Sequence, residues 1–241
     1  VGGQFVVQIS QGTLSPDMMD GWSSNATNTG FIKLMQDYGL TDIMRDRTLD
    51  WNPVVVKSHD EKENEDGSIT YTVEINDNLK WSDGSDITAK DYLFAIMLRS
   101  SKQFVECEGD ATTGSPLLGY TEFNSGDKKE FTGLRLLGDY EFSMTVDAEN
   151  LPDYYVLGNI GYTPDPMAAI APGTDILDDG NGGYFNDKFT TDVLRETLLD
   201  PNEGFRYKRP VVCGPYKLKS IDVSTETVEL EINEEFLGRP D

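Results

Sequence analysis

The stretch from Ile69 to Arg99 constrains the fold most, because its apolar spacing changes from that of a strand to that of a helix. Apolar and polar residues alternate from Ile69 to Ile75, which predicts a strand with one face in the core. Asn, Asp, Ser and Gly residues then predict two turns. Thr88 predicts a helix N-cap, with Asp91 as its capping-box partner. We therefore expect a strand, a turn region and an inward-packed helix that begins at Ala89.

The rest of the chain alternates short strand-like and helix-like patterns. The expected strands are 5–9, 54–56, 134–137 paired with 140–146, and 228–232. The expected helices are 31–38, ended by Gly39, together with 117–126, 154–160 and 192–199. Residues 11–28, 100–116 and 175–187 lack a period and are expected to be loops, the first long enough to line a site. This mixture predicts an α+β fold.

Charge and hydropathy exclude some classes of partner. The chain carries 43 acidic and 20 basic residues, a formal charge of −23, whereas a nucleic-acid partner requires a basic surface. No apolar run approaches the roughly 20 residues that cross a bilayer. No export signal is visible either. These features fit an acidic protein that functions outside the cytoplasm and has no nucleic-acid partner.

Residues typical of catalysis or metal binding are sparse. His59 is the only histidine, and no Ser or Cys stands in a nucleophile motif. Cys107 and Cys213 lack metal-ligand spacing, and they are interpreted either as two buried thiols or as a disulfide. Residues 175–187 are rich in Asp, Asn and Gly but do not match an EF-hand loop. We therefore expect no metal and no cofactor, while a catalytic carboxylate pair stays open because its separation is a spatial property.

The segment YTVEINDNLKWSDGSDITAKDYLFAIM resembles the signature of the family 5 extracellular solute-binding proteins, the oligopeptide and dipeptide receptors of ABC importers. Its matching positions are Trp81, Ser82, Asp83, Gly84, Thr88, Ala89 and Asp91. The tail resembles the family's GTGPYKL segment at Gly214, Pro215 and Tyr216, with Cys213 where Thr is usual. Residues 118–137 and the positions Asn233, Phe236 and Pro240 also resemble family segments. Several ordered motifs together are more specific than any one of them.

The resemblance implies the mixed-sheet first lobe of a two-lobed, periplasmic-binding-protein-like (venus-flytrap) fold. We expect residues 1–241 to hold mostly this first lobe, with about 50–165 as an inserted subdomain around the strand–turn–helix unit. The second lobe and the C-terminal return are then expected to be missing from this chain. A cleft that closes on a ligand needs both lobes and a hinge.

The resemblance also implies a function. We expect an extracytoplasmic substrate-binding component of an ABC importer, not an enzyme, that binds a peptide or a similar small solute in an interlobe cleft. Its partners would be that solute and the importer's membrane subunits. It would be a cell-surface lipoprotein or a periplasmic protein, with its signal segment and any lipid anchor outside this chain. The alternatives are a carboxylate-pair hydrolase and a surface sensor without an importer.

Two sets of residues follow from the resemblance. Those expected to face the cleft and bind ligand are Ser23, Ser24, Asn25, Tyr38, Gly39 and Leu40. Those expected to build the scaffold without touching ligand are Trp81, Ser82, Asp83, Gly84, Thr88, Asp91, Gly214, Pro215 and Tyr216. A tryptophan between two turns buries a large apolar area, which favours a packing role over a ligand-binding role.

Overall fold

The computed structural model describes residues 6, 13–22 and 25–238, and its main sheet has four antiparallel strands. Their order across the sheet is β3 (Val56–Glu63), β4 (Ile69–Ile75), β6 (Glu141–Val146) and β5 (Leu134–Leu136). Within the described residues all strand pairs are antiparallel, so the expected mixed sheet appears only as antiparallel sheets. The α+β prediction itself is confirmed.

Helix α2 (Ala89–Leu98) is the centre of the core, with every residue except Lys90 buried. It packs on the main sheet, where Tyr92 stacks on Phe142 with ring centroids 5.7 Å apart. The sheet contributes three alternating side chains of β4 that are buried as predicted, while the fourth, Ile69, is half-buried. Each such side chain stabilises the fold by about 1.5–3 kcal/mol relative to an exposed one. The helix begins at Ala89 as expected, because Asp91 accepts a hydrogen bond from the Thr88 N–H at 2.8 Å.

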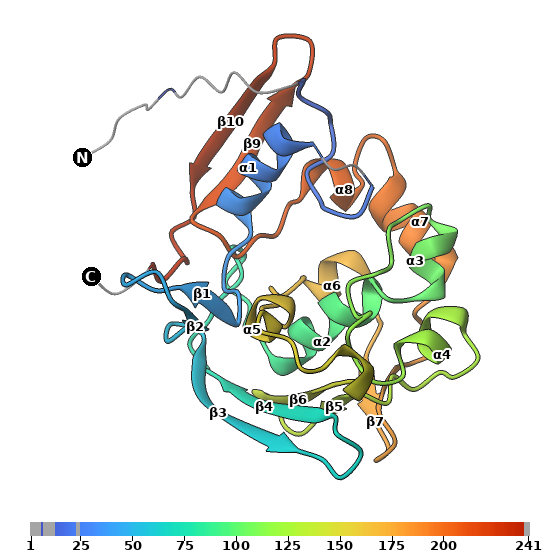
Figure 1. Cartoon of the computed structure of the whole chain (residues 1–241). Helices are drawn as coiled ribbons and strands as arrows, with labels where there is room; N and C mark the ends of the chain where they lie inside the picture. Colours follow the sequence, from blue (N-terminus) through green and yellow to red (C-terminus); the bar gives the residue numbers. More distant parts are fainter. Residues whose placement is uncertain (1–5, 7–12, 23–24, 239–241) are drawn as a thin grey trace.

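A second, smaller core lies at the other end of the molecule. Helix α1 (Ala26–Met35) packs there against the hairpin of β9 (Tyr216–Asp222) and β10 (Thr227–Ile232). The buried residues of this smaller core are Leu14, Met18, Met35 and Val212. Figure 1 shows α1 and this hairpin at one end, the main sheet at the other, and α2, α5 and α6 between them.

The remaining elements are short, and most of them pack around the larger core. They are β1 (Thr41–Ile43), β2 (Leu49–Trp51), α3 (Lys102–Glu106), α4 (Tyr120–Ser125), a 3-10 turn (Ala148–Asn150), α5 (Val156–Asn159), α6 (Met167–Ile170), β7 (Ile176–Asp178), β8 (Gly183–Phe185), α7 (Thr191–Leu199) and α8 (Phe205–Lys208). None of the helices in the described ranges is long and apolar enough to span a bilayer.

Several expected elements are confirmed. Leu136 and Phe142 are paired across the β5–β6 hairpin. Helix α4 ends at Gly126, whose φ is +80°. Helix α7 is capped by Thr190, whose hydroxyl accepts from the Val193 N–H.

Other predictions were wrong. Helix α1 ends at Met35 rather than at Gly39, because the Met35 carbonyl is engaged by the tail of the chain. Helix α3 lies within the supposed loop 100–116, and the β7–β8 hairpin within 175–187. Cys107 and Cys213 are both free and buried, which excludes the disulfide reading. The expected strand 5–9, apart from residue 6, lies outside the described residues, as does Pro240.

Candidate functional site

The segment 13–22 is irregular, as predicted, yet it is held at fixed points. Asn28 of α1 accepts a hydrogen bond from the Ser15 N–H at 3.0 Å. Its amide nitrogen donates to the carbonyl oxygens of Ser15 at 2.8 Å and Asp17 at 2.6 Å. One buried amide therefore uses donors and acceptor together to fix the path of the segment.

Helix α8 holds the same segment from the other side. The Arg206 guanidinium donates to both carboxylate oxygens of Asp17, at 2.5 and 3.1 Å, and lies 4.6 Å from the ring centre of Trp22. The Trp22 indole N–H donates to the Cys107 carbonyl at 2.9 Å, and its ring packs on Phe104 at 4.9 Å. We call Asp17, Trp22, Phe104 and Arg206 the Trp22 corner. Because Trp22 stays half-buried, the corner presents an aromatic surface beside a cation.

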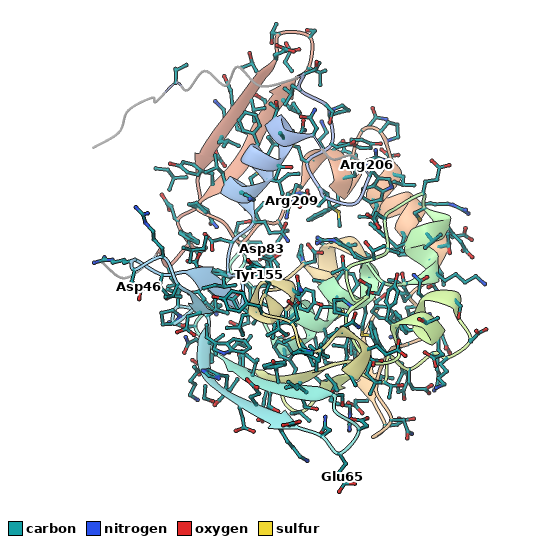
Figure 2. The ribbon with its side chains drawn as sticks, in the orientation of Figure 1. Asp46, Glu65, Asp83, Tyr155, Arg206 and Arg209 are labelled. Atoms are coloured by element: carbon teal, nitrogen blue, oxygen red, sulfur yellow. The ribbon has the colours of Figure 1, made fainter. Side chains whose placement is uncertain are left out.

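A buried group of charges lies deeper, which we call the guanidinium cluster: Arg99, Asp165 and Arg209. Asp165 is fully buried and accepts from the Arg99 guanidinium at 2.5 Å and from the Gln36 amide at 3.3 Å. Arg209, 3% exposed, donates to the Met18 carbonyl at 2.8 Å. Burial holds the pKa of Arg209 below its usual range, and the Asp165 carboxylate opposes this. Figure 2 shows Arg206 beside α8 and Arg209 toward the middle of the molecule.

Of the residues expected to bind ligand, Asn25 is the N-cap of α1. Its side-chain oxygen accepts from the Thr27 N–H at 2.9 Å, and its amide donates to the Thr13 carbonyl. It therefore ties the segment 13–22 to the start of the helix. Ser23 and Ser24 lie outside the described residues.

Tyr38 and Leu40 are buried, at 1% and 0% exposure. The Tyr38 hydroxyl accepts from the Leu237 N–H at 3.0 Å, its ring stacks on Phe236 at 5.3 Å, and burial raises its pKa to about 12. The Leu40 N–H donates a hydrogen bond to the Tyr162 carbonyl, and the Leu40 carbonyl accepts one from the Asn52 N–H. Their side chains thus pack in the core, and only Gly39 between them is half-buried. Ligand contact by this trio stays a prediction.

The residues of the scaffold motif occupy positions that suit their types: the tryptophan is buried, and the Asp-Gly pair forms an exposed turn. Trp81 is 3% exposed and packs in the main core. Asp83 accepts from the Ser85 N–H at 3.0 Å in the exposed turn labelled in Figure 2, where Gly84 has a φ of +85°. Ser82 donates its N–H to the Val212 carbonyl at 2.9 Å. The turn motif and the tail motif, distant in sequence, therefore touch.

The tail motif fastens α1. The N–H groups of Cys213 and Gly214 donate to the Met35 carbonyl at 3.2 and 2.8 Å, which ends the helix. Pro215 accepts from the Asn233 N–H at 2.9 Å. Tyr216 begins β9 and is 38% exposed.

No other feature of the described residues is as well supported as a ligand-binding site. Within the described ranges no group of three His, Cys, Asp or Glu residues is placed to hold a metal ion. A cavity of about 370 Å³ lies between α6, α7 and α8. It is lined by Ala169, Glu196, Thr197, Asp200, Glu203, Phe205 and Pro210, none of them an expected ligand residue.

Reasoning from sequence missed the polar residues that organise this region: Asp17, Trp22, Arg99, Asp165, Arg206 and Arg209. One signal was available. Acidic residues outnumber basic residues by 43 to 20, yet two arginines, Arg206 and Arg209, stand shortly before the tail motif. Their partners are 189 and 191 residues away in the chain, so no local pattern predicts them.

Comparison with known families gives a match over residues 46–241 to the profile described as bacterial extracellular solute-binding proteins, family 5 middle. Two curated relatives are the oligopeptide-binding protein OppA of Lactococcus lactis subsp. lactis (strain IL1403) and the periplasmic oligopeptide-binding protein OppA of Salmonella typhimurium. The first is 25% identical over 176 residues, covering 70% of this chain and 25% of its own length. The second is 27% identical over 185 residues, covering 72% and 27%. The chain thus spans about a quarter of these relatives.

Solved structures share the fold. The complex of Haemophilus influenzae OppA with RPPGFSPFR superposes with a TM-score of 0.65 at 18% identity, covering 94% of this chain and 38% of the other. Peptide-bound OppA of Listeria monocytogenes gives a TM-score of 0.62 at 17% identity, with the same two coverages. The described chain therefore has the fold of part of these larger proteins.

Proposed function

Because the chain belongs to the bacterial extracellular solute-binding proteins of family 5, we propose that it is part of a receptor that binds peptides outside the cytoplasm for an ABC importer. The match over residues 46–241 carries this proposal. The curated relatives named as oligopeptide-binding proteins and the peptide-bound structures support a peptide as the solute. The importer subunits and a lipid anchor remain parts of the proposal.

We further propose that the chain forms mostly the first lobe of a two-lobed receptor, with about 50–165 as an inserted subdomain. Two observations support the division. All four strands of the main sheet fall between Val56 and Val146. Helix α1 and the β9–β10 hairpin build a separate core from residues on both sides of that range.

The Trp22 corner is the ligand-facing surface that the geometry supports best. Trp22 directly precedes Ser23, Ser24 and Asn25 in the sequence, and it stays half-buried although three groups fix it. A rigid aromatic surface contributes affinity at little entropic cost.

A binding protein accounts for the buried acids better than a hydrolase does. The buried carboxylates Asp17, Asp91 and Asp165 are all engaged with arginine or backbone partners. A carboxylate pair for hydrolysis needs access to substrate and water. A sensor without an importer would use the same surface, and only the partner distinguishes it.

Titration calorimetry with a peptide pool tests both the function and the surface, using a protein of the relatives' length. We expect the unmodified protein to bind peptide without cleaving it, and Trp22→Ala to weaken binding about ten-fold, or roughly 1.4 kcal/mol. Trp51→Ala is the matched control, because Trp51 is also half-buried but stacks on exposed His59. Equal losses in both variants would remove the corner from the site, and peptide cleavage would refute the receptor.

A further inference from the structure

Arg209 is a buried cation with very few partners. A guanidinium carries five N–H donors. Among the described residues its one hydrogen-bond acceptor is the Met18 carbonyl, and its Nε is buried without an acceptor. Buried N–H groups are almost always paired in folded proteins, so this atom marks a missing partner.

Arg99 presents the same deficit close by. Its terminal nitrogen donates to Asp165, but its Nε is also buried and unpartnered. The two guanidinium groups are near enough to interact electrostatically. Within the described ranges Asp165 is the one carboxylate in ion-pair contact with either of them, while Asp20 acts on Arg209 only from farther away. An unpaired buried charge costs several kcal/mol, which favours a further negative partner.

The missing partner must be an acceptor, because both unpaired atoms of the cluster are donors. A water molecule would supply a lone pair but would bring two more hydrogens that need acceptors of their own. An anion supplies lone pairs only and also offsets the excess positive charge. We propose that the guanidinium cluster binds a small inorganic anion of halide size through the Nε–H groups of Arg99 and Arg209. This site is independent of the proposed peptide-binding function.

Crystals of the protein soaked in sodium bromide give a direct test, because bromide scatters anomalously and water does not. An anomalous peak at hydrogen-bond distance from the Nε of Arg99 or Arg209 is the expected result. A water at that place without anomalous signal, or anomalous peaks confined to the protein surface, would overturn the proposal.

Thermal unfolding tests the same site in solution, with sodium chloride compared against sodium gluconate at equal ionic strength. Matching ionic strength removes the general screening expected for a protein of charge −23. We expect chloride to raise Tm by a few degrees more than gluconate, since a ligand of the folded state stabilises it. No chloride excess would overturn the proposal, and stabilisation by acetate but not chloride would replace the halide by a carboxylate.

Variants assign the effect to the cluster. Arg209→Lys and Arg99→Lys keep the charge but remove Nε, so each should abolish the chloride excess, and either one suffices if the other fails to fold. Arg195→Lys is the matched control on α7, where the side chain is 56% exposed, and it should keep the full effect. An undiminished chloride excess in both cluster variants would refute the assignment.

Discussion

Gly214 lies closer to α1 than a side chain allows. A Cβ there would stand 2.5 Å from the Met35 carbonyl carbon and 2.6 Å from the Leu34 oxygen. Both are backbone atoms of a packed helix, so they cannot move aside cheaply. We expect Gly214→Ala to lower the free energy of unfolding by about 1–3 kcal/mol, as overpacking does. Urea unfolding measures this.

Gly30 provides the matched control. It lies inside α1, and a Cβ there would meet nothing within 4 Å. Gly30→Ala should therefore stabilise the protein by about 0.5–1 kcal/mol, because glycine is a poor helix former. If both alanine variants shift stability in the same direction, the close approach at Gly214 is not what matters.

Asp91 should make stability depend on pH. Burial raises its pKa from 3.8 to about 6, against the lowering effect of its hydrogen bonds to Thr88 and Met167. Because the folded state holds the proton more tightly, this stabilising contribution is complete below pH about 4 and is lost as pH rises through about 6. A rise of this size corresponds to roughly 3 kcal/mol between the two protonation states.

The test compares the unmodified protein with Asp91→Asn by urea unfolding between pH 4.5 and 7.5, values that bracket the pKa of about 6. The stability of the unmodified protein relative to the variant should increase as pH falls. Asp222→Asn is the control and should show almost no slope in this range, because hydrogen bonds from Ser224 and Thr225 lower the pKa of Asp222 from its usual 3.8, so this carboxylate stays ionised throughout. A pH-independent difference for Asp91→Asn would contradict the assignment.

Among the helices and strands, the sequence predicted the ones that have a clear apolar period or an N-cap residue. Strand β4 and helix α2 follow their apolar spacing, and α7 follows its threonine cap. Helix α3 was missed because five residues with one buried side chain, Phe104, carry no period. That helix depends on tertiary packing against Trp22. The end of α1 was misplaced for the same reason, since Gly214 reaches it from the far end of the chain.

The candidate site was predictable only in outline. The irregular path of 13–22 follows from sequence, whereas the end of the expected loop 11–28 belongs to α1, which Asn25 caps. The partners of that segment, Arg206 and Arg209, are set by tertiary contacts that a single sequence does not reveal.

The β7–β8 hairpin was missed as well, and Asp178 explains what holds it. Its carboxylate accepts from the Arg135 guanidinium at 2.7 Å and from the Leu136 N–H at 3.0 Å, joining β7 to β5. Asp178→Ala leaves these donors unpaired, which should lower the free energy of unfolding by about 1–3 kcal/mol. Hydrogen exchange should rise locally in 176–185.

Asp192→Ala is the control that removes a carboxylate charge at an exposed position. Asp192 is 94% exposed and pairs with Arg195 at 3.5 Å on the same helix. Its loss should change stability by about 0.5 kcal/mol or less. Equal effects of the two alanine variants would show that Asp178 only contributes charge.

Across the whole molecule, the polypeptide passes from the smaller to the larger core near residues 36–41 and returns near residues 205–218. The guanidinium cluster links these two passages to the central helix. Asp165 accepts from Gln36 of the first passage and from Arg99 of α2, and Arg209 belongs to the second passage. The two parts should move as one body, and any closing motion must involve a surface other than this junction.

A closing motion requires a second lobe, which sets a last prediction. If the Trp22 corner is one wall of a cleft, the 241-residue chain supplies only that wall. Its peptide affinity should then be at least about ten-fold lower than that of a protein with the full length of its relatives, because less ligand surface is buried and no closure traps the peptide. Parallel calorimetric titrations measure both, with Trp22→Ala in each to show that the same surface is used. Equal affinities would mean that this chain already contains the complete site.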